Sequence, residues 1–219
     1  MATVVITGCN RGIGLELCRQ YMERGDKVLA VCRQPSDELT ATGARVIPGV
    51  DVADDAGVAA LAGHVADEAV DILVNNAGIL RGDSLDSVDY DDMLEQYRVN
   101  TIGPLRVTRA LLGNLSEGSK VGIVTSRVGS IEDNGSGNNY GYRCSKAAAN
   151  MLGMNLHHDL SAHGIAVMLL HPGLVATDMT GGTGISAADS AAGLIARLDE
   201  LGPETSGTFW HAEGYQLPW

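Results

Sequence analysis

Short runs of apolar, often β-branched residues alternate along the chain with longer stretches in which apolar residues recur every three or four positions. The short runs predict strands at 3–7, 27–31, 44–48, 71–75, 120–125, 165–170 and 208–210. Most of these runs lack the alternation of a half-exposed strand, and continuous apolar strands are typical of sheets buried on both faces. We therefore expect a sheet that is covered by helices on each side.

The longer stretches have the spacing of amphipathic helices. They predict helices at 12–24, 54–68, 87–97, 99–115, 140–162 and 187–201. Strands alternate with helices throughout, and no repeat or linker interrupts the pattern. The sequence therefore predicts one domain over 1–219, of the α/β class, with a doubly wound parallel sheet of about seven strands and helices on both faces.

Two of the expected helices, 99–115 and 140–162, carry apolar faces that are wider than packing on one side of a sheet requires. An ordinary core would explain these faces, and so would contact with a second copy of the chain.

Composition narrows the possible partners and location. The chain has 219 residues, 45% of them apolar, and a formal net charge of -12, which disfavours nucleic acid and anionic membranes. No apolar run approaches the roughly 20 residues that span a bilayer. Met1 leads directly into the first strand, and the four cysteines have no metal-site spacing. We expect reduced thiols, no metal and a cytoplasmic location.

The segment TGCNRGIG joins the first strand to the first helix and contains Gly8, Gly12 and Gly14. Glycines here permit a tight turn and let the backbone approach a pyrophosphate, which the amino end of the following helix would attract. This context predicts a dinucleotide site; the alternative is a structural turn without a ligand.

The end of the second strand indicates which dinucleotide binds. An NAD site usually places an acid there for the ribose 2'-hydroxyl, but this chain has Cys32 followed by Arg33, with Arg11 in the glycine turn. Two guanidinium groups suit a 2'-phosphate, so we expect NADP(H) in preference to NAD(H), unless both arginines are ordinary surface residues. Asp51 and Val52 follow the third strand; they would contact the adenine, or Asp51 would cap the next helix.

Further polar features follow strands whose carboxyl ends share one edge of the expected sheet. They are Asn75–Gly78 (NNAG), Ser126 and 171–173 (HPG), together with Asn100 and the Tyr142–Lys146 segment YRCSK on helices. Each is weak alone, because Asn, Ser and Pro-Gly are common in turns. Doubly wound sheets bind ligands at this edge, so their shared placement predicts a site there.

These motifs, in this order, resemble the short-chain dehydrogenase/reductase family. The resemblance rests on TGxxxGxG, NNAG, Asn100, Ser126, YxxxK and the PG pair, and covers essentially the whole chain. The segments TSRVGSIEDN, YRCSKAAANM and LPW are most similar to its small carbonyl-reductase-like branch, related to sniffer and C-factor proteins. The resemblance implies a Rossmann-type fold.

It also implies a catalytic tetrad of Asn100, Ser126, Tyr142 and Lys146. Tyr142 would exchange a proton with the substrate oxygen while hydride is transferred, and Ser126 would polarise that oxygen. Lys146 would bond the nicotinamide ribose and, with the oxidised nicotinamide, lower the pKa of Tyr142. Asn100 would help to hold Lys146 through a water relay.

The cofactor-binding residues carried over from the motifs run from the glycine turn to the segment after the sixth strand. They are Gly8, Asn10, Arg11, Gly12, Ile13, Gly14, Arg33, Asp51, Val52, Asn75, Ala77, Gly78, Tyr142, Lys146, Pro172, Gly173, Val175 and Thr177. Among them, Asn75 and Ala77 would border the adenosine, and Thr177 would reach the nicotinamide carboxamide.

Two assignments have competitors nearby. Ser130 stands twelve residues before Tyr142 and Ser126 sixteen, but Ser126 follows its strand directly and is preferred. Tyr140 also lies near Lys146. On a helix, residues four apart differ by about 40° and residues six apart by about 120°, so Tyr142 shares the face of Lys146 and Tyr140 does not.

The resemblance implies an NADPH-dependent oxidoreductase that reduces a ketone or aldehyde to an alcohol, or catalyses the reverse reaction. Its partner would be a small carbonyl or alcohol substrate, with residues 174–186 as a short substrate loop. Relatives suggest a homodimer or homotetramer through the helices 99–115 and 140–162. An NADP-binding sensor or signalling protein with little turnover is the alternative.

Overall fold

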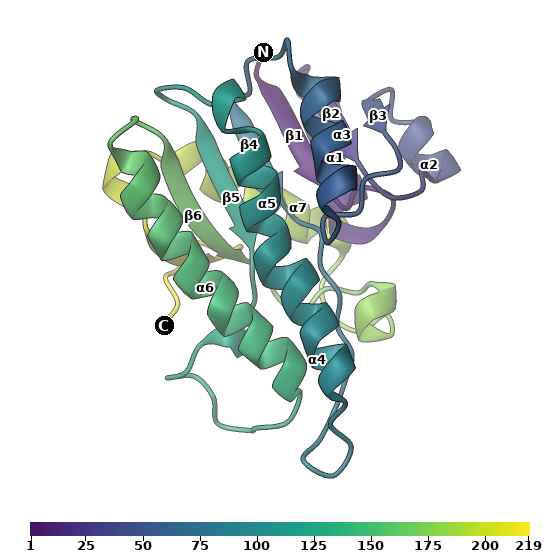
Figure 1. Cartoon of the computed structure of the whole chain (residues 1–219), viewed down its shortest axis with the longest axis vertical. Coiled ribbons are helices and arrows are strands. Elements are labelled where there is room, and N and C mark those ends of the chain that lie inside the picture. Colours follow the sequence, from purple (N-terminus) through teal and green to yellow (C-terminus); the bar gives the residue numbers. More distant parts are fainter.

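The computed structural model describes all 219 residues and centres on a seven-stranded sheet (Figure 1). All neighbouring strands are parallel, in the order β3-β2-β1-β4-β5-β6-β7. The strands are β1 (Thr3–Thr7), β2 (Lys27–Val31), β3 (Arg45–Ile47), β4 (Ile72–Asn75), β5 (Lys120–Val124), β6 (Ala166–His171) and β7 (Thr208–His211). The predicted doubly wound parallel sheet is confirmed.

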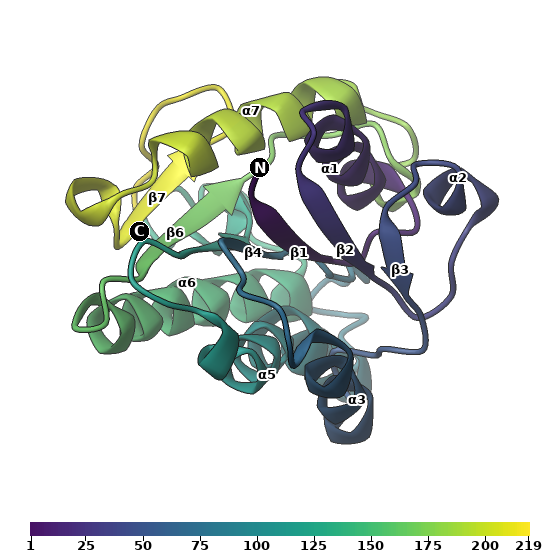
Figure 2. The same cartoon turned by 90° about the horizontal axis from the view of Figure 1, so that it is seen from above.

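Helices cover both faces of the sheet. They are α1 (Gly12–Glu23), α2 (Asp37–Thr40), α3 (Asp55–Val65), α4 (Tyr90–Tyr97), α5 (Gly103–Ala110), α6 (Tyr140–Ser161) and α7 (Ala187–Glu200). Figure 2 shows α1 and α7 on one face and α3, α5 and α6 on the other. The strands are continuously apolar because helices cover them on both faces.

The alternation of side chains along β1 divides the core into two layers. Val4 and Ile6 pack in the layer under α1 and α7, which includes Leu198. Val5, between them in sequence, packs in the layer under α3, α5 and α6, with Val107. Every residue of this strand after the first is buried, so β1 holds the following glycine turn on a rigid support.

The helices around residue 98 differ from the prediction. In place of two helices at 87–97 and 99–115, α4 continues through a π-helical turn, Arg98–Ile102, into α5, which ends at Ala110. The helix begins at Tyr90 because the Asp89 carboxylate accepts hydrogen bonds from the amides of Asp91 and Asp92. A π turn inserts one extra residue and so rotates the helix, a change that apolar periodicity does not reveal.

Strand order opens a crevice at the carboxyl edge. The chain goes from β1 to β2 on one side and reaches β4 on the other, so the connections that leave β1 and β4 run to opposite faces. Such a switch point leaves room for a ligand between the two strand ends. None of the helices has the combination of length and apolarity that crossing a bilayer demands.

Candidate active site

A cavity of about 670 Å³ occupies the carboxyl edge of the sheet. Most of the residues predicted to bind the cofactor line it. These are Gly8, Asn10, Arg11, Gly12, Ile13, Gly14, Arg33, Asp51, Val52, Ala77, Gly78, Tyr142, Lys146, Pro172 and Thr177. Asn75, Gly173, Val175, Asn100 and Ser126 are not among the lining residues. Segments from across the sequence therefore meet at one cavity.

The glycine turn fits a dinucleotide pyrophosphate. Gly8 and Gly12 have φ angles of 72° and 55°, which favour glycine. A Cβ on Gly14 would lie 2.2 Å from the Gly8 carbonyl oxygen, so the turn and the start of α1 are packed directly against each other. No side chain caps the amino end of α1 and its first turn has no acidic residue. The first amides of α1 are thus suited to an anion.

Two arginines lie at this cavity, each near one carboxylate. Arg33 lies 3.8 Å from Asp51, and Arg11 lies 3.7 Å from Asp178. Both guanidinium groups are largely exposed, and exposed ion pairs at such distances are weak, so either arginine can turn to a phosphate.

The expectation that Asp51 could cap α3 is wrong, because the Asp54 carboxylate accepts a hydrogen bond from the Gly57 amide and Asp54 is the N-cap.

The two asparagines of NNAG point in different directions. Asn75 is buried, and its side-chain amide donates to the Thr108 hydroxyl on α5, away from the cavity. Asn76 lines the cavity instead and donates to the carbonyl oxygens of Thr7 and Gly8 at 2.9 and 3.2 Å. Asn76 lies within the NNAG motif but is not among the residues predicted from the sequence to bind the cofactor. The alternation of side chains at the end of β4 was the signal that could have identified it.

Tyr142 lies on the first turn of α6, on the same face as Lys146, whose Nζ is 5.7 Å from the centre of its ring. Burial raises the pKa of Tyr142 to about 12, and a hydrogen bond with Ser126 acts in the opposite direction. The pKa of Tyr142 in the free protein is thus raised, whereas the resemblance implies a lowered pKa in the complex with oxidised nicotinamide. At neutral pH the Tyr142 phenol is protonated.

Lys146 is buried, and its Nζ donates a hydrogen bond of 2.9 Å to the Val124 carbonyl oxygen at the end of β5. Burial lowers the pKa of Lys146 to about 8. The group is therefore still largely a cation at neutral pH. Gly78 lies beside it, since a Cβ there would be in ordinary contact with Nζ at 3.6 Å.

Asn100 lies within the π-helical turn, and its side-chain amide binds the backbone of Ile79 and the side chain of Ser145. Its Oδ1 accepts from the Ile79 amide at 2.8 Å, and its Nδ2 donates to the Ile79 carbonyl oxygen at 2.9 Å and to the Ser145 hydroxyl at 3.0 Å. The structure has no direct hydrogen bond between the side chains of Asn100 and Lys146. Its visible role is to hold the segment after NNAG.

The structure separates the competing serines and tyrosines. The Ser130 hydroxyl donates to the Trp219 carbonyl oxygen at 3.0 Å and accepts from the Asp133 amide, so it is occupied away from Tyr142. Ser126 is the serine that contacts the Tyr142 phenol. Tyr140 is 38% exposed. Ser126 and Tyr142 are thus the pair in contact, and of the two only Tyr142 lines the cavity.

The segment 174–186 folds back on itself beside the cavity. The Ala176 amide donates to the Ile185 carbonyl oxygen at 2.8 Å, and the Ile185 amide donates to the Leu174 carbonyl oxygen at 2.9 Å. Thr177 then reaches the glycine turn, where a Cβ on Gly12 would lie 3.2 Å from its Cγ2. The two ends of the segment are thus paired, and residues 177–184 form a loop whose first residues, Thr177–Met179, line the cavity.

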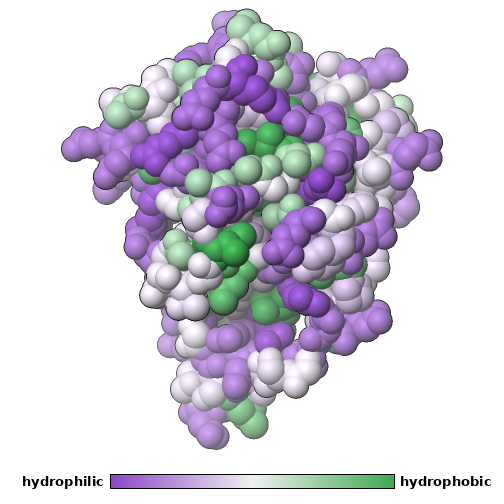
Figure 3. Space-filling view, turned by 180° about the vertical axis from the view of Figure 1, so that it is seen from behind, coloured by the Kyte–Doolittle hydropathy of each residue, from purple (hydrophilic) through white to green (hydrophobic).

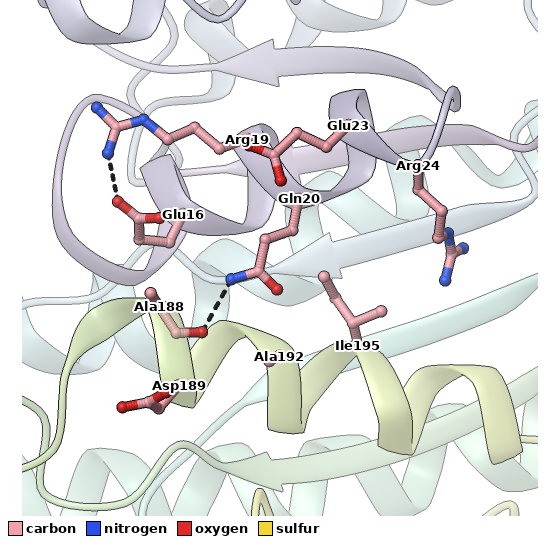
Figure 4. A pocket seen from close by; sticks show the side chains of 9 residues that line it. All are labelled: Glu16, Arg19, Gln20, Glu23, Arg24, Ala188, Asp189, Ala192 and Ile195. Carbon is pink, nitrogen blue, oxygen red and sulfur yellow. Dashed lines mark hydrogen bonds and ion pairs between the residues drawn. The ribbon is translucent and has the colours of Figure 1, made fainter.

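A second hollow, of about 600 Å³, lies between α1 and α7 (Figure 4). Gln20 crosses it to the Ala188 carbonyl oxygen at 2.8 Å, while Arg19 turns to Glu16 on its own helix. None of the predicted site residues lines it. The predicted site residues that line a cavity therefore lie at the first one.

The family profile described as short chain dehydrogenase matches residues 2–186. The chain belongs to the short-chain dehydrogenase family. Members of this family are oxidoreductases that bind a nicotinamide cofactor. The cavity at the strand ends is lined by most of the residues predicted from the sequence to bind such a cofactor.

Two curated proteins show how this short-chain dehydrogenase relates to others. It is 48% identical to the 1-hydroxy-2-glutathionyl-2-methyl-3-butene dehydrogenase of Rhodococcus sp. (strain AD45), with 100% of both chains covered. It is 44% identical to the C-signal protein of Myxococcus xanthus, over 73% of this chain and 99% of that protein.

Solved structures agree with the fold of the family. The NADPH-bound carbonyl reductase from chicken fatty liver superposes with a TM-score of 0.91 at 32% identity, covering 100% of this chain and 99% of that one. The carbonyl reductase Sniffer of D. melanogaster also gives 0.91, at 27% identity and with 100% of both chains covered. The expected similarity to the carbonyl-reductase branch is confirmed.

Proposed function

We propose that the protein interconverts a ketone or aldehyde and the corresponding alcohol with NADP(H), using Tyr142 as the acid and base. The observation that carries the proposal is the meeting of three side chains, two of which line the cavity while the third, Ser126, lies against Tyr142. Tyr142 contacts Ser126, and Lys146 shares the helix face of Tyr142 and lines the same cavity.

When bound, the nicotinamide supplies the hydride for the carbonyl carbon. Ser126 donates a hydrogen bond to the carbonyl oxygen and so draws electron density away from the carbon. Tyr142 gives its phenolic proton to the same oxygen as the carbon–oxygen double bond becomes single. Lys146, still largely cationic at neutral pH, stabilises the phenolate that remains and bonds the ribose.

The protonation of Tyr142 favours reduction. A phenol whose pKa is raised to about 12 is a proton donor throughout the physiological range. Oxidation of an alcohol needs the phenolate, which the cations around Tyr142 must stabilise. The free protein is therefore prepared for carbonyl reduction, and the reverse reaction requires the positive charge of the oxidised cofactor.

Arg11 and Arg33 support the choice of NADP(H). They supply positive charge at the cavity, and buried Cys32 stands where an NAD site usually has an acid. Chicken carbonyl reductase, which shares the fold, has NADPH bound. We propose that one or both guanidinium groups bind the 2'-phosphate.

The full-length similarity to the Rhodococcus enzyme suggests a substrate class. That enzyme's name describes an alcohol next to a carbon that carries a glutathionyl thioether. Exposed Ile131 and Leu174, on loops at the same edge of the sheet, offer apolar surface to the hydrocarbon part of such a substrate. Primary alcohols and aldehydes with an adjacent thioether therefore belong in any substrate panel.

The test measures NADPH and NADH oxidation spectrophotometrically with a panel of ketones, aldehydes, quinones and glutathionyl aldehydes. Tyr142→Phe should lower kcat by about 100- to 10,000-fold, the usual range for a lost general acid. Tyr140→Phe is the matched control, and at most its substrate preference should change. Full activity in Tyr142→Phe would refute the mechanism.

Similarity to the C-signal protein favours a second candidate, an NADP-binding signalling protein with little turnover. Binding alone needs no proton donor beside Ser126 and Lys146, so we favour the enzyme. Calorimetry with NADP⁺, combined with the same panel, separates the two: tight binding without turnover of any substrate supports the signalling protein.

A further inference from the structure

The segment after NNAG, residues 79–83, is held to the neighbouring helix at alternate residues. Asn100 binds both the amide and the carbonyl oxygen of Ile79, at 2.8 and 2.9 Å. Gln96 does the same for Arg81, at 2.9 and 3.4 Å. Gln96 and Asn100 stand four apart and face the same way, and both are buried. Two side-chain amides thus bind the backbone of this segment in the way that a neighbouring strand would.

The far end of this segment binds the amino end of the catalytic helix. Asp83 accepts from three successive amides: its backbone carbonyl oxygen from Asn139 at 2.9 Å, its Oδ1 from Tyr140 at 2.5 Å and its Oδ2 from Gly141 at 3.0 Å. The N-cap residue of α6, Asn139, has a left-handed backbone with φ of 50°, and its side chain makes no cap. Asp83 therefore supplies the cap that α6 lacks.

The first turn of α6 packs directly against α4, so it cannot move closer to that helix. A Cβ on Gly141 would lie 2.5 Å from the Gln96 Nε2 and 3.1 Å from Met93. Gln96 thus contacts both the segment 79–83 and the turn that Asp83 caps. Tyr142 follows Gly141 directly, so the same contacts determine where its phenol lies.

We propose that Asp83 is a positioning residue for Tyr142, a role that rests on the proposed function of Tyr142 as the acid. Without the carboxylate, the Tyr140 and Gly141 amides lose their acceptor and the first turn of α6 frays. The phenol then leaves its place beside Ser126. Lys146 lies one turn further on and keeps its own bond to the Val124 carbonyl oxygen. Loss of the carboxylate should therefore slow proton transfer and leave the affinity for the cofactor unchanged.

The kinetic test compares Asp83→Ala, Asp83→Asn and Asp86→Ala with the wild type. Asp86 lies exposed in the same loop, and its carboxylate makes no hydrogen bond, so Asp86→Ala removes the same charge without removing a contact. In Asp83→Ala, kcat should fall by about 10- to 100-fold, because a displacement of about 1 Å can have that cost. KM for NADPH and the dissociation constant of NADP⁺ should stay unchanged. Asp83→Asn keeps an acceptor and should recover much of kcat, and Asp86→Ala should match the wild type.

Hydrogen exchange gives a second readout that needs no substrate. Amides of residues 139–143 should exchange at least several-fold faster in Asp83→Ala than in Asp86→Ala, whereas those of the last turns of α6 should not change. Equal exchange in the two variants, or a kcat equal to that of Asp86→Ala, overturns the proposal. Loss of thermal stability with unchanged kcat also overturns it, because Asp83 is then only structural.

Failure of the proposed function has a different signature. Tyr142→Phe with full activity, or a protein that turns over nothing, refutes the function while the exchange result still decides whether Asp83 fixes the turn. An inactive Tyr142→Phe together with a fully active Asp83→Ala refutes the role of Asp83 alone.

Discussion

Burial acts in opposite directions on the pKa values of the two titratable residues of the site. It raises the pKa of Tyr142 to about 12 and lowers that of Lys146 to about 8, because a low-polarity environment disfavours the charged form of each. Between pH 6 and pH 10, Tyr142 therefore stays protonated. Lys146 is the residue of this pair that changes charge in that interval.

This difference predicts the pH dependence of reduction. The Lys146 ammonium is present below its pKa and is lost as the pH rises through about 8. We expect kcat/KM for NADPH to be level below that pH and then to fall by about ten-fold per unit, since this ratio reports the free enzyme. Initial rates from pH 6 to pH 10 measure it. A ratio that rises through pH 8 would contradict the assignment.

The glycine turn, α1 and the end of β4 meet closely around Gly14. A Cβ on Gly14 would lie 2.2 Å from the Gly8 carbonyl oxygen and 2.6 Å from the Asn76 amide nitrogen. The turn, α1 and the end of β4 thus fit together with no space for a methyl group. Such a fit explains why glycine, with no Cβ, stands at this position inside a helix.

Gly14→Ala should therefore destabilise the protein by about 1–3 kcal/mol or more, the usual cost of overpacking. Gly63→Ala is the matched control: Gly63 is an exposed helical residue of α3 whose Cβ would meet nothing within 4 Å. That change should stabilise by roughly 0.5–1 kcal/mol, because alanine loses less backbone entropy in a helix. Urea denaturation measures both. Equal effects of the two changes would contradict the close fit.

Local sequence predicted the strands better than the helix boundaries. All seven strands lie within one or two residues of their expected places, because buried strands need continuous apolar runs. The helices 87–97 and 99–115 proved to be one continuous helix with a π turn, and α2 was not predicted. The π turn carries Asn100, whose bonds to Ile79 come from a segment some 20 residues away, which periodicity along one helix cannot indicate.

At the scale of the whole molecule, apolar side chains remain exposed on the helices expected to form an interface. Leu105 of α5, Leu112 just after it and Met151 of α6 are 40%, 45% and 65% exposed. These two helices lie side by side on one face of the sheet (Figures 1 and 2). The opposite face is broadly hydrophilic, with apolar atoms gathered near its middle (Figure 3). We propose association through the face of α5 and α6.

Analytical ultracentrifugation should accordingly detect a homodimer or homotetramer. Met151→Glu should shift it towards the monomer, because a buried unpaired carboxylate strongly disfavours an interface. Leu85→Glu is the control, since Leu85 is an exposed apolar residue of a loop outside these helices. A wild-type protein that is monomeric at all concentrations would refute the proposal.

The sequence by itself determined the layers, the glycine turn and the order of the motifs, because these depend on local periodicity and on residue types at short spacing. It also distinguished Tyr142 from Tyr140, since helix geometry is local. Tertiary structure alone decided that Asn76 and not Asn75 faces the cavity, that Ser130 is held by Trp219, and that Asp83 caps α6. Each of these depends on which distant backbone atom lies within hydrogen-bonding distance, and packing of the folded chain determines that distance.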